Sequence, residues 1–203
     1  MKKKSNFLFR LVSLLPDGPW MQKKPADQLS SKGSFKDGKE DGPWEMYYES
    51  GQLEFRGTYK EGRRHGPWEM YYESGALKTR GTSVLGRPHG PFERYYENGQ
   101  LSERSHSRRG ELSGPFESFH PNGQLKEKGT YSGGFKDGLN ETYYANGQLQ
   151  STGHYKDGGM EGPWLFYYEN GQLGKRENYK DGVLDGLWEY FDETGKLKQR
   201  KTY

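Results

Sequence analysis

Aromatic side chains alternate with polar ones over short stretches of this sequence, and glycine-containing dipeptides separate the stretches. Residues 42–65 read GPWEMYYESGQLEFRGTYKEGRRH: a run with alternating aromatics, Ser50-Gly51, a second run and a glycine-rich loop. Alternation with period two predicts a β-strand, and such a dipeptide between two runs predicts a β-hairpin with a two-residue type I′ turn. The dipeptide recurs at Ser50-Gly51, Ser74-Gly75, Asn98-Gly99, Asn122-Gly123, Asn146-Gly147 and Asn170-Gly171.

The hairpin unit repeats every 24 residues. Glycines keep this spacing at Gly18, Gly42, Gly66, Gly90, Gly114, Gly138, Gly162 and Gly186. A fixed period of about 20–50 residues indicates a stacked repeat array, in which terminal units are usually atypical. We therefore expect an N-terminal segment, 1–17, and then an array, 18–203, of about 7.75 repeats: 18–41, 42–65, 66–89, 90–113, 114–137, 138–161, 162–185 and 186–203. The degenerate first repeat is expected to act as a cap.

A two-residue loop would fix which residues lie opposite each other. In the second repeat it pairs Glu49 with Gln52, Tyr48 with Leu53, Met46 with Phe55, Glu45 with Arg56 and Trp44 with Gly57. Glutamate then faces a base in Glu45/Arg56, Glu69/Arg80, Glu93/Arg104, Glu117/Lys128 and Glu189/Arg200. The rings of Trp44 and Trp68 are expected to lie across Gly57 and Gly81. One face carries Trp or Phe, Tyr and Leu, and the other carries Glu, Tyr and Arg.

Composition favours a thin sheet over a conventional two-layer core. Isoleucine is absent and valine occurs only at Val12, Val84 and Val183, so few aliphatic residues can fill a core. Aromatic residues nevertheless make up 15% of the chain and the net charge is only +3, which argues against disorder. The predicted fold is all-β: an elongated, single-layer antiparallel β-meander built from stacked 24-residue β-hairpin repeats.

The repeat, written roughly GxWxxYYxNGxLxxxGxYxDGxxD, resembles the MORN-repeat variant found in bacterial antitoxins of the YwqK type. The resemblance extends over 18–203 and implies an antiparallel β-meander that is used for binding. Departures from the pattern make the fifth to seventh repeats the places where stacking is expected to change. They are Asn140 for the aromatic residue, Leu139 and Leu187 for proline, His120-Pro121 within a strand, and Glu177 for a glycine.

No arrangement of residues predicts catalysis, a cofactor or a metal site. The chain has no cysteine, which removes thiolate ligands, disulfides and cysteine nucleophiles. His65 and His89 are one repeat apart, about 9.6 Å by strand spacing, which is too far to share a zinc ion, and His106 and His154 are two repeats apart. The glutamates have the same spacing and mostly face Arg or Lys, which keeps them ionised. We therefore expect a protein that is not an enzyme.

Charge argues against nucleic acid as a partner, although aromatics interleaved with bases also describe single-strand binders. The basic excess lies in 1–41, and 42–203 carries about as many acidic as basic residues, whereas a polyanion binder is basic along its binding face. The loops between hairpins are basic early and acidic late. The bases are Arg63, Arg64, Arg87, Arg108 and Arg109, and the acids are Asp157, Glu161, Asp181 and Asp185. These segments are either solvated loops or a polar binding edge.

Variation between repeats is greatest in the middle of the aromatic face. The residues concerned, named the variable row below, are Met46/Phe55, Met70/Thr79, Arg94/Glu103, Ser118/Glu127, Thr142/Ser151, Phe166/Lys175 and Tyr190/Gln199. A regular scaffold with a varied strip is typical of a binding surface, although drift at tolerant positions would give the same pattern. The candidate partner-binding residues are Met46, Phe55, Met70, Arg94, Glu103, Phe166, Lys175 and Tyr190, together with the loop bases Arg63, Arg64, Arg87, Arg108 and Arg109.

The N-terminal segment has lysines at 2–4 before an apolar stretch at 7–15, which Arg10 interrupts. The stretch is too short for a transmembrane helix and lacks a following cleavage motif, so we favour an amphipathic cap over an export signal, and the cytoplasm over export. The predicted function is that of a bacterial antitoxin or immunity protein, expected to be a monomer, which binds a toxin or effector encoded nearby. The alternative is a peripheral module for anionic phospholipid surfaces.

Overall fold

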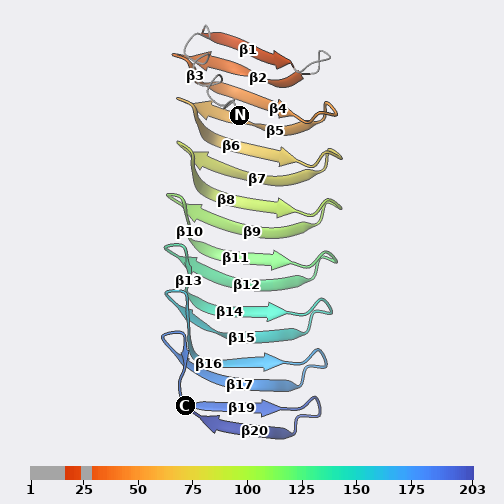
Figure 1. Cartoon of the computed structure of the whole chain (residues 1–203), viewed down its shortest axis with the longest axis vertical. Helices are drawn as coiled ribbons and strands as arrows, with labels where there is room; N and C mark the ends of the chain where they lie inside the picture. Colours follow the sequence, from red (N-terminus) through yellow and green to blue (C-terminus); the bar gives the residue numbers. More distant parts are fainter. Residues whose placement is uncertain (1–16, 24–28) are drawn as a thin grey trace, which may run out of the picture. The chain divides into compact units, whose positions relative to one another are not determined.

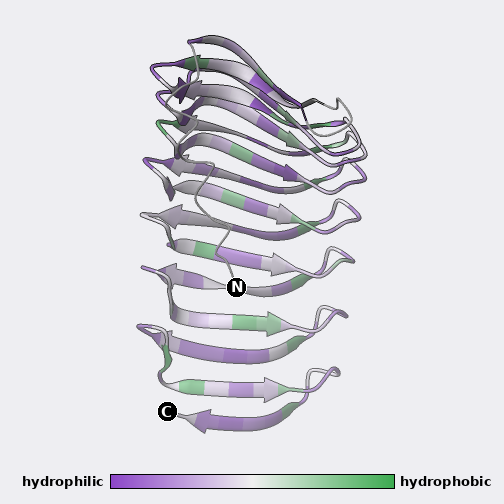
Figure 2. Cartoon of the chain, turned by 45° about the horizontal axis from the view of Figure 1, so that its top comes forward, coloured by the Kyte–Doolittle hydropathy of each residue, from purple (hydrophilic) through white to green (hydrophobic). Residues whose placement is uncertain are grey.

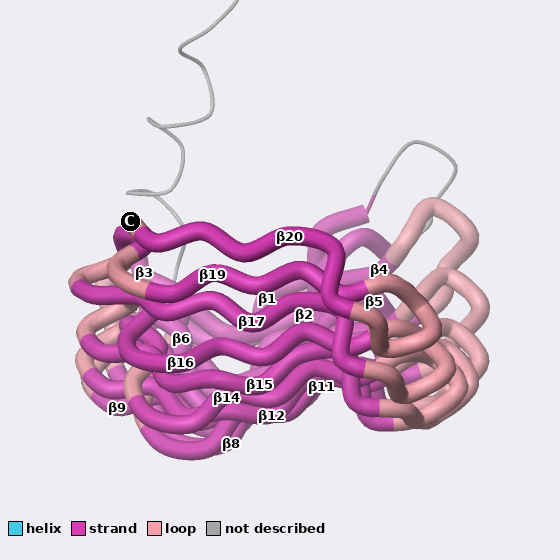
Figure 3. Tube along the Cα trace, turned by 90° about the horizontal axis from the view of Figure 1, so that it is seen from below, coloured by secondary structure: helices cyan, strands magenta, loops and turns pink. Residues whose placement is uncertain are grey.

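The computed structural model describes residues 17–23 and 29–203, which form twenty β-strands and no helix (Figure 1). They divide into two compact units: one extends to Gly90 and includes Glu97–Gly99, and the other comprises Pro91–Tyr96 and Gln100–Tyr203. Within each unit the strands pair antiparallel, and loops lie at the strand ends (Figure 3). The predicted all-β fold class, an antiparallel meander of hairpin repeats, is confirmed. The predicted N-terminal cap lies, apart from Asp17, outside the described residues.

Both units contain strands of five to nine residues together with strands of two residues. The first unit contains β1 (Gly18–Lys23), β2 (Leu29–Lys36), β3 (Lys39–Glu40), β4 (Gly42–Tyr47), β5 (Leu53–Lys60), β6 (Arg63–Tyr71), β7 (Leu77–Val84) and the start of β8 (Arg87–Tyr95). The second contains the rest of β8 and then β9 (Leu101–Arg108), β10 (Glu111–Leu112), β11 (Gly114–Phe119), β12 (Leu125–Ser132), β13 (Phe135–Lys136), β14 (Gly138–Tyr143), β15 (Leu149–Lys156), β16 (Gly159–Tyr167), β17 (Leu173–Lys180), β18 (Val183–Leu184), β19 (Leu187–Phe191) and β20 (Leu197–Thr202).

The turns at the six Ser-Gly and Asn-Gly dipeptides differ from the predicted type I′ turn. In the second repeat the amide of Tyr48 donates to the carbonyl of Gln52 at 2.9 Å, and that of Gly51 donates to Tyr48 at 3.1 Å. The loop therefore has three residues, 49–51, and of these only Gly51 has a positive φ, 86°. This geometry is a type I turn followed by a left-handed glycine. Further along the hairpin a bulge shifts the register between Met46 and Tyr47.

The bulge absorbs the extra loop residue, so most of the register is as predicted. The predicted pairs Glu49–Gln52 and Tyr48–Leu53 are wrong, because Leu53 pairs with Tyr47. Beyond the bulge the predicted pairs are confirmed: Met46–Phe55, Glu45–Arg56 and Trp44–Gly57. A one-residue slip would have reversed the faces of the strand, and the bulge prevents this.

Type I′ turns do occur, but they join one hairpin to the next. Glu61 and Gly62 have φ values of 52° and 76°, and Lys60 pairs directly with Arg63. Positive φ at both central residues defines the type I′ turn, which Asp-Gly favours. The same positive angles are found at Asp37-Gly38, Asp157-Gly158 and Asp181-Gly182. The glycine-rich segments interpreted as loops are therefore tight turns.

Tryptophan rings cover strand glycines, as predicted, but Trp44 covers a different glycine from the one expected. A Cβ built on Gly33 would lie 1.8 Å from the ring of Trp44, and one built on Gly153 would lie 2.2 Å from that of Trp164. Both glycines belong to the preceding hairpin, whereas Gly57 is the backbone partner of Trp44 in its own hairpin. Each of these rings therefore ties two successive hairpins together.

The first unit has a small core on the face that carries the tryptophans, called the tryptophan face below. Phe35, Trp44 and Phe55 are buried there, and Trp20, Met46, Tyr59, Trp68 and Met70 pack against them. Hydrophobic patches are short on otherwise hydrophilic strands (Figure 2). The described residues of this unit form neighbouring strands of one sheet and no helix, so they provide no second layer over the tryptophan face.

Side chains at the hairpin loops add hydrogen bonds between repeats. The Tyr48 hydroxyl donates to the carbonyl of Tyr71 at 2.7 Å. His120, expected to interrupt a strand, follows the end of β11 at Phe119 and occupies the position of Tyr48 in its repeat. Its Nε2 lies 2.8 Å from the carbonyl of Tyr143, so the histidine replaces the tyrosine contact.

Two other departures from the repeat pattern are buried polar groups with partners. Asn140 is 3% exposed and donates to the Glu127 carboxylate at 3.0 Å. Glu177 is 5% exposed and accepts hydrogen bonds from Trp188 Nε1 at 2.9 Å and the Tyr179 hydroxyl at 2.7 Å. Buried polar groups are tolerated when their hydrogen bonds are made. Hairpin pairing therefore continues through the fifth to seventh repeats.

Candidate binding surface

Backbone pairing aligns the variable positions of each unit into one row that crosses the strands. In the first unit Phe55 of β5 pairs with Met46 of β4 and Met70 of β6, and Met70 pairs with Thr79 of β7. In the second unit the successive pairs are Glu103–Ser118, Ser118–Glu127, Glu127–Thr142, Thr142–Ser151, Ser151–Phe166, Phe166–Lys175, Lys175–Tyr190 and Tyr190–Gln199. Positions 24 residues apart in sequence are thus two strands apart in space.

In the first unit the variable row is apolar at three of its four positions, with Thr79 as the fourth. Phe55 is 4% exposed, and Met46 and Met70 are half-buried around it. The exposed Arg64 joins this patch, because its guanidinium lies 5.8 Å from the ring centroid of Phe55 and 5.4 Å from that of Trp68. A cation over an aromatic face is stabilised electrostatically, by about 0.5–1 kcal/mol at exposed sites. Four of the predicted candidates, three from the row and one from the loops, therefore belong to one patch.

In the second unit the row begins with charged and hydroxyl side chains. Arg94 Nη1 and Glu103 Oε2 lie 3.4 Å apart, so these two candidates form an ion pair. Glu127 pairs with the amine of Lys136 on β13. Thr142 Oγ1 and Ser151 Oγ share a hydrogen bond of 2.7 Å. This part of the row satisfies its own polar groups and offers little apolar area.

The row ends in aromatic residues around a lysine. Lys175 Nζ lies 4.3 Å from the ring centroid of Phe166 and 3.0 Å from Glu177 Oε1. Tyr190, the next candidate along the row, is 40% exposed, and its hydroxyl lies 3.1 Å from that of Tyr168. Phe166, Lys175 and Tyr190 therefore lie on neighbouring strands, with Lys175 between the two rings.

The opposite face carries a ladder of ion pairs that connect successive hairpins. The base comes from the preceding hairpin in Lys32–Glu45 at 2.7 Å, Arg56–Glu69 at 2.5 Å, Lys128–Glu141 at 2.5 Å, Arg176–Glu189 at 3.2 Å and Arg104–Glu117. Of the pairs predicted within one hairpin, Glu189–Arg200 also forms, at 2.5 Å. The predicted backbone register is thus correct, but most of these carboxylates contact the base on their other side.

We expect Glu69 to couple energetically to Arg56. A double-mutant cycle with Glu69→Gln and Arg56→Gln, followed by urea unfolding, should give a coupling of about 0.2–1 kcal/mol, the usual range for an exposed pair. Glu69 and Lys78 provide the control, because Lys78 lies over the ring of Tyr72, 5.3 Å from its centroid. A larger coupling for the control pair would show that the strands have a different register.

The hydrogen bond from the Tyr71 hydroxyl to Glu69, 2.6 Å long, makes stability depend on pH in two ranges. It lowers the pKa of Glu69 from 4.5, so the stability that the ionised Glu69 side chain contributes is complete above pH 4.5 and is lost as the pH falls. Burial, and to a smaller extent this hydrogen bond, raises the pKa of Tyr71 from 10.0 to about 12. The stability that the neutral Tyr71 hydroxyl contributes is therefore complete below pH 10 and is lost by about pH 12.

The difference in free energy of unfolding between the wild type and Tyr71→Phe should therefore shrink between pH 10 and 12. Urea titrations of both proteins at pH 8, 10 and 11.5 measure it. A difference that stays constant over this range would contradict the assigned hydrogen bond.

The basic loop residues are exposed, and within the first unit Arg63 and Arg64 do not lie on one face of the sheet. Arg63, Arg64 and Arg87 belong to the first unit, and Arg108 and Arg109 to the second. Arg63 pairs with Lys60 in the backbone register and Arg64 pairs with Tyr59, so the two neighbouring arginines point to opposite faces of the sheet.

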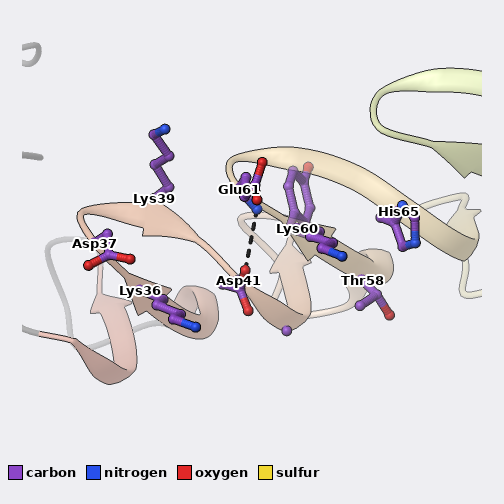
Figure 4. A pocket seen from close by; sticks show the side chains of 10 residues that line it. Lys36, Asp37, Lys39, Asp41, Thr58, Lys60, Glu61 and His65 are labelled. Carbon is purple, nitrogen blue, oxygen red and sulfur yellow. Dashed lines mark hydrogen bonds between the residues drawn. The ribbon is translucent and has the colours of Figure 1, made fainter.

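A hollow of about 490 Å³ lies at the turn edge of the first unit. Figure 4 shows Glu61 beside Asp41, to whose carboxylate its amide donates at 3.3 Å, and Lys39 extending away from Lys60. The charged residues that line the hollow are Lys36, Asp37, Lys39, Asp41, Lys60 and Glu61, with His65 beside them. Equal numbers of lysines and carboxylates give the hollow no preference for a charged ligand.

Two further site types find no support in the described part of the chain. Residues 17–23 and 29–203 contain no group of three or more His, Asp or Glu side chains placed to hold a metal ion. Nor do they contain a helix long and apolar enough to cross a membrane.

One position next to the type I′ turn faces the variable row, which the sequence pattern did not indicate. This position holds Arg64 in one repeat and Lys136 three repeats later; Lys136 pairs with Tyr131 in the backbone and lies 5.2 Å from the ring centroid of Tyr155. The two bases are 72 residues, or three repeats, apart in the sequence, which indicates equivalent positions. A flexible loop, however, would not determine where their side chains point. The tight turn fixes their direction.

The MORN repeat variant family matches the chain at seven segments: 40–61, 64–83, 88–107, 112–132, 136–157, 160–181 and 184–203. Together these segments make up well over half of the chain and follow the 24-residue period. No curated protein sequence resembles the chain closely enough to count as a relative.

Proposed function

Since the chain belongs to the MORN repeat variant family, whose repeats serve as a module for binding proteins and membranes, we propose that it binds a partner protein through its variable row. The partner is a toxin or effector encoded nearby, and the chain acts as an antitoxin or immunity protein without catalytic activity of its own. The row in the described strands supplies the contacts, and the tryptophans and glycines supply the scaffold.

The observation that carries this proposal is the contrast between the row and its neighbours. Positions beside the row repeat the same chemistry, with Trp44 and Trp164 each lying over a glycine of the preceding hairpin. The row itself changes from Met46 and Phe55 in the first unit to Arg94 and Glu103 in the second. Repeat scaffolds keep the residues that stack the units and vary those that select the partner.

Coexpression with the product of the adjacent gene tests the proposal. The chain should restore growth to cells that make that product and should copurify with it. Reversing the charges of both Arg94 and Glu103 changes the charge pattern of the variable row. The matched control reverses the charges of the Arg104–Glu117 pair on the opposite face of the same unit. Loss of neutralisation in the first variant alone supports the proposal, and equal neutralisation by both variants contradicts it.

A peripheral phospholipid-binding function is the second candidate, favoured by the exposed Arg63, Arg64 and Arg87 of the first unit. Flotation with vesicles of phosphatidylcholine and phosphatidylglycerol at low and high salt tests it. Binding that is lost at high salt and on reversal of the three arginines would support membrane association, because exposed surface charges are screened by salt. No flotation at low salt would contradict it.

A further inference from the structure

The tryptophan face of the first unit carries an apolar strip that crosses three neighbouring strands, with Met46 and Met70 half-buried and Phe55, only 4% exposed, between them. Met46, Phe55 and Met70 pair successively on β4, β5 and β6, so they lie about 4.8 Å apart from strand to strand. This spacing is close to the rise of about 5.4 Å per turn of an α-helix. A helix that lies along the strip can therefore place apolar side chains two turns apart against Met46 and Met70, and these two methionines can adapt to its shape.

An arginine stands beside this strip, at the position that Glu40 holds in the preceding hairpin. Arg64 lies over the rings of Phe55 and Trp68 and, among the residues that the structure describes, forms no ion pair. Lys136 occupies the equivalent position in the second unit, and there a carboxylate of the variable row, Glu127, neutralises it. The row position that corresponds to Glu127 is Phe55, so the first unit lacks that carboxylate.

We infer that the first unit binds an amphipathic helix of the partner protein that carries a carboxylate beside its apolar stripe. The stripe lies over Met46, Phe55 and Met70, and the carboxylate pairs with Arg64. This inference rests on the proposed function and specifies the chemistry of the partner. It uses the helix-on-apolar-surface mode of recognition, in which anchors follow an i, i+3, i+4, i+7 pattern.

The charge of Arg64 selects the partner because a carboxylate there gains an ion pair over aromatic rings, whereas an ammonium group meets a like charge. Arg63 provides a matched control for this effect. It has the same charge, is likewise exposed and occupies the adjacent position, but its side chain is on the opposite face of the sheet. Reversing Arg63 therefore changes the net charge of the protein by the same amount without touching the strip.

Two 20-residue helical peptides test the inference on the full chain. They share one Leu/Met stripe, and one carries Glu beside the stripe where the other carries Lys. By fluorescence anisotropy the Glu peptide should bind at least tenfold more tightly. Arg64→Glu should abolish this preference and Arg63→Glu should retain it, with thermal unfolding confirming that both variants fold. Equal affinities, no binding of either peptide, or an equal effect of both reversals would overturn the inference.

The methionine methyl signals locate the peptide. In ¹³C-methyl NMR the Glu peptide should shift the signals of Met46 and Met70 but leave those of Met21 and Met160 in place. Met21 lies on the other face, opposite Lys32, and Met160 belongs to the second unit. Shifts confined to Met21 or Met160 would contradict the assigned surface.

Failure of the inference can be separated from failure of the proposed function. A toxin that still binds Arg64→Glu, and is released by changes to Arg94 and Glu103, would overturn the helix site and leave the proposed function standing. If instead Arg64→Glu abolishes flotation with anionic vesicles while neither peptide binds, the patch is a lipid site and the inference is wrong.

Discussion

Replacing Trp164 by alanine is expected to destabilise the second unit by about 3 kcal/mol or more, the usual result of deleting a well-packed large aromatic side chain. Trp164 is 2% exposed, and its ring centroid lies 5.0 Å from that of Tyr155 and 6.0 Å from that of Phe166. Its Nε1 also donates to the carbonyl of His154 at 3.1 Å. Because this face has few aliphatic residues, no neighbouring side chain can refill the space.

Urea unfolding followed by circular dichroism measures the change. Tyr190→Ala is the control in the same unit, because Tyr190 is 40% exposed and its truncation should have a much smaller effect. A loss below about 0.5 kcal/mol for Trp164→Ala would show that the ring does not pack on the preceding hairpin, since even modest core truncations exceed this value.

Replacing Gly153 by alanine should also destabilise the second unit strongly, by about 1–3 kcal/mol, although it adds only one methyl group. That methyl carbon would lie 2.2 Å from the ring of Trp164, so the ring must move. The penalty depends on the ring, and Gly153→Ala should therefore be nearly neutral in a Trp164→Ala background. A double-mutant cycle by urea unfolding tests this dependence. An equal penalty in both backgrounds would mean that the added methyl clashes with something else.

The sequence was sufficient to predict the hairpins and most of their register, but not the type of turn. A glycine after Ser or Asn fits both a type I′ turn and a three-residue loop, because the second needs a positive φ at the glycine alone. In the loop that forms, Asn122 Oδ1 accepts a hydrogen bond from the amide of Gln124 at 3.1 Å, a local contact typical of asparagine in turns. The register still held, since a bulge returned the strands to the predicted pairs.

Contacts between hairpins were harder to predict than contacts within them. Pairing inside a hairpin follows from its loop, whereas the neighbour on the other side depends on how the next turn closes. For this reason the sequence predicted that the ring of Trp44 covers Gly57, whereas the ring covers Gly33. It likewise predicted a Glu69–Arg80 pair but not the ion pair between Glu69 and Arg56. The variable row could be predicted, because both kinds of pairing keep its residues aligned.

The orientation of the bases next to the turns could not be predicted for the same reason. A segment interpreted as a loop leaves Arg64 free to point in any direction, whereas the type I′ turn at Glu61-Gly62 fixes it opposite Tyr59. The candidate surface therefore includes Arg64, one of the five loop bases, beside the variable row. Arg63, its neighbour in the sequence, lies on the opposite face.

The dissociation rate of the complex with the product of the adjacent gene tests most directly whether the variable row binds the partner. Surface plasmon resonance should compare Arg94→Ala/Glu103→Ala with the matched pair Arg104→Ala/Glu117→Ala on the opposite face. We expect the first variant to dissociate at least tenfold faster, equivalent to about 1.4 kcal/mol, and the second to dissociate as the wild type does. An unchanged dissociation rate for the first variant, with faster dissociation for the second, would place the partner on the ion-pair face and contradict the account.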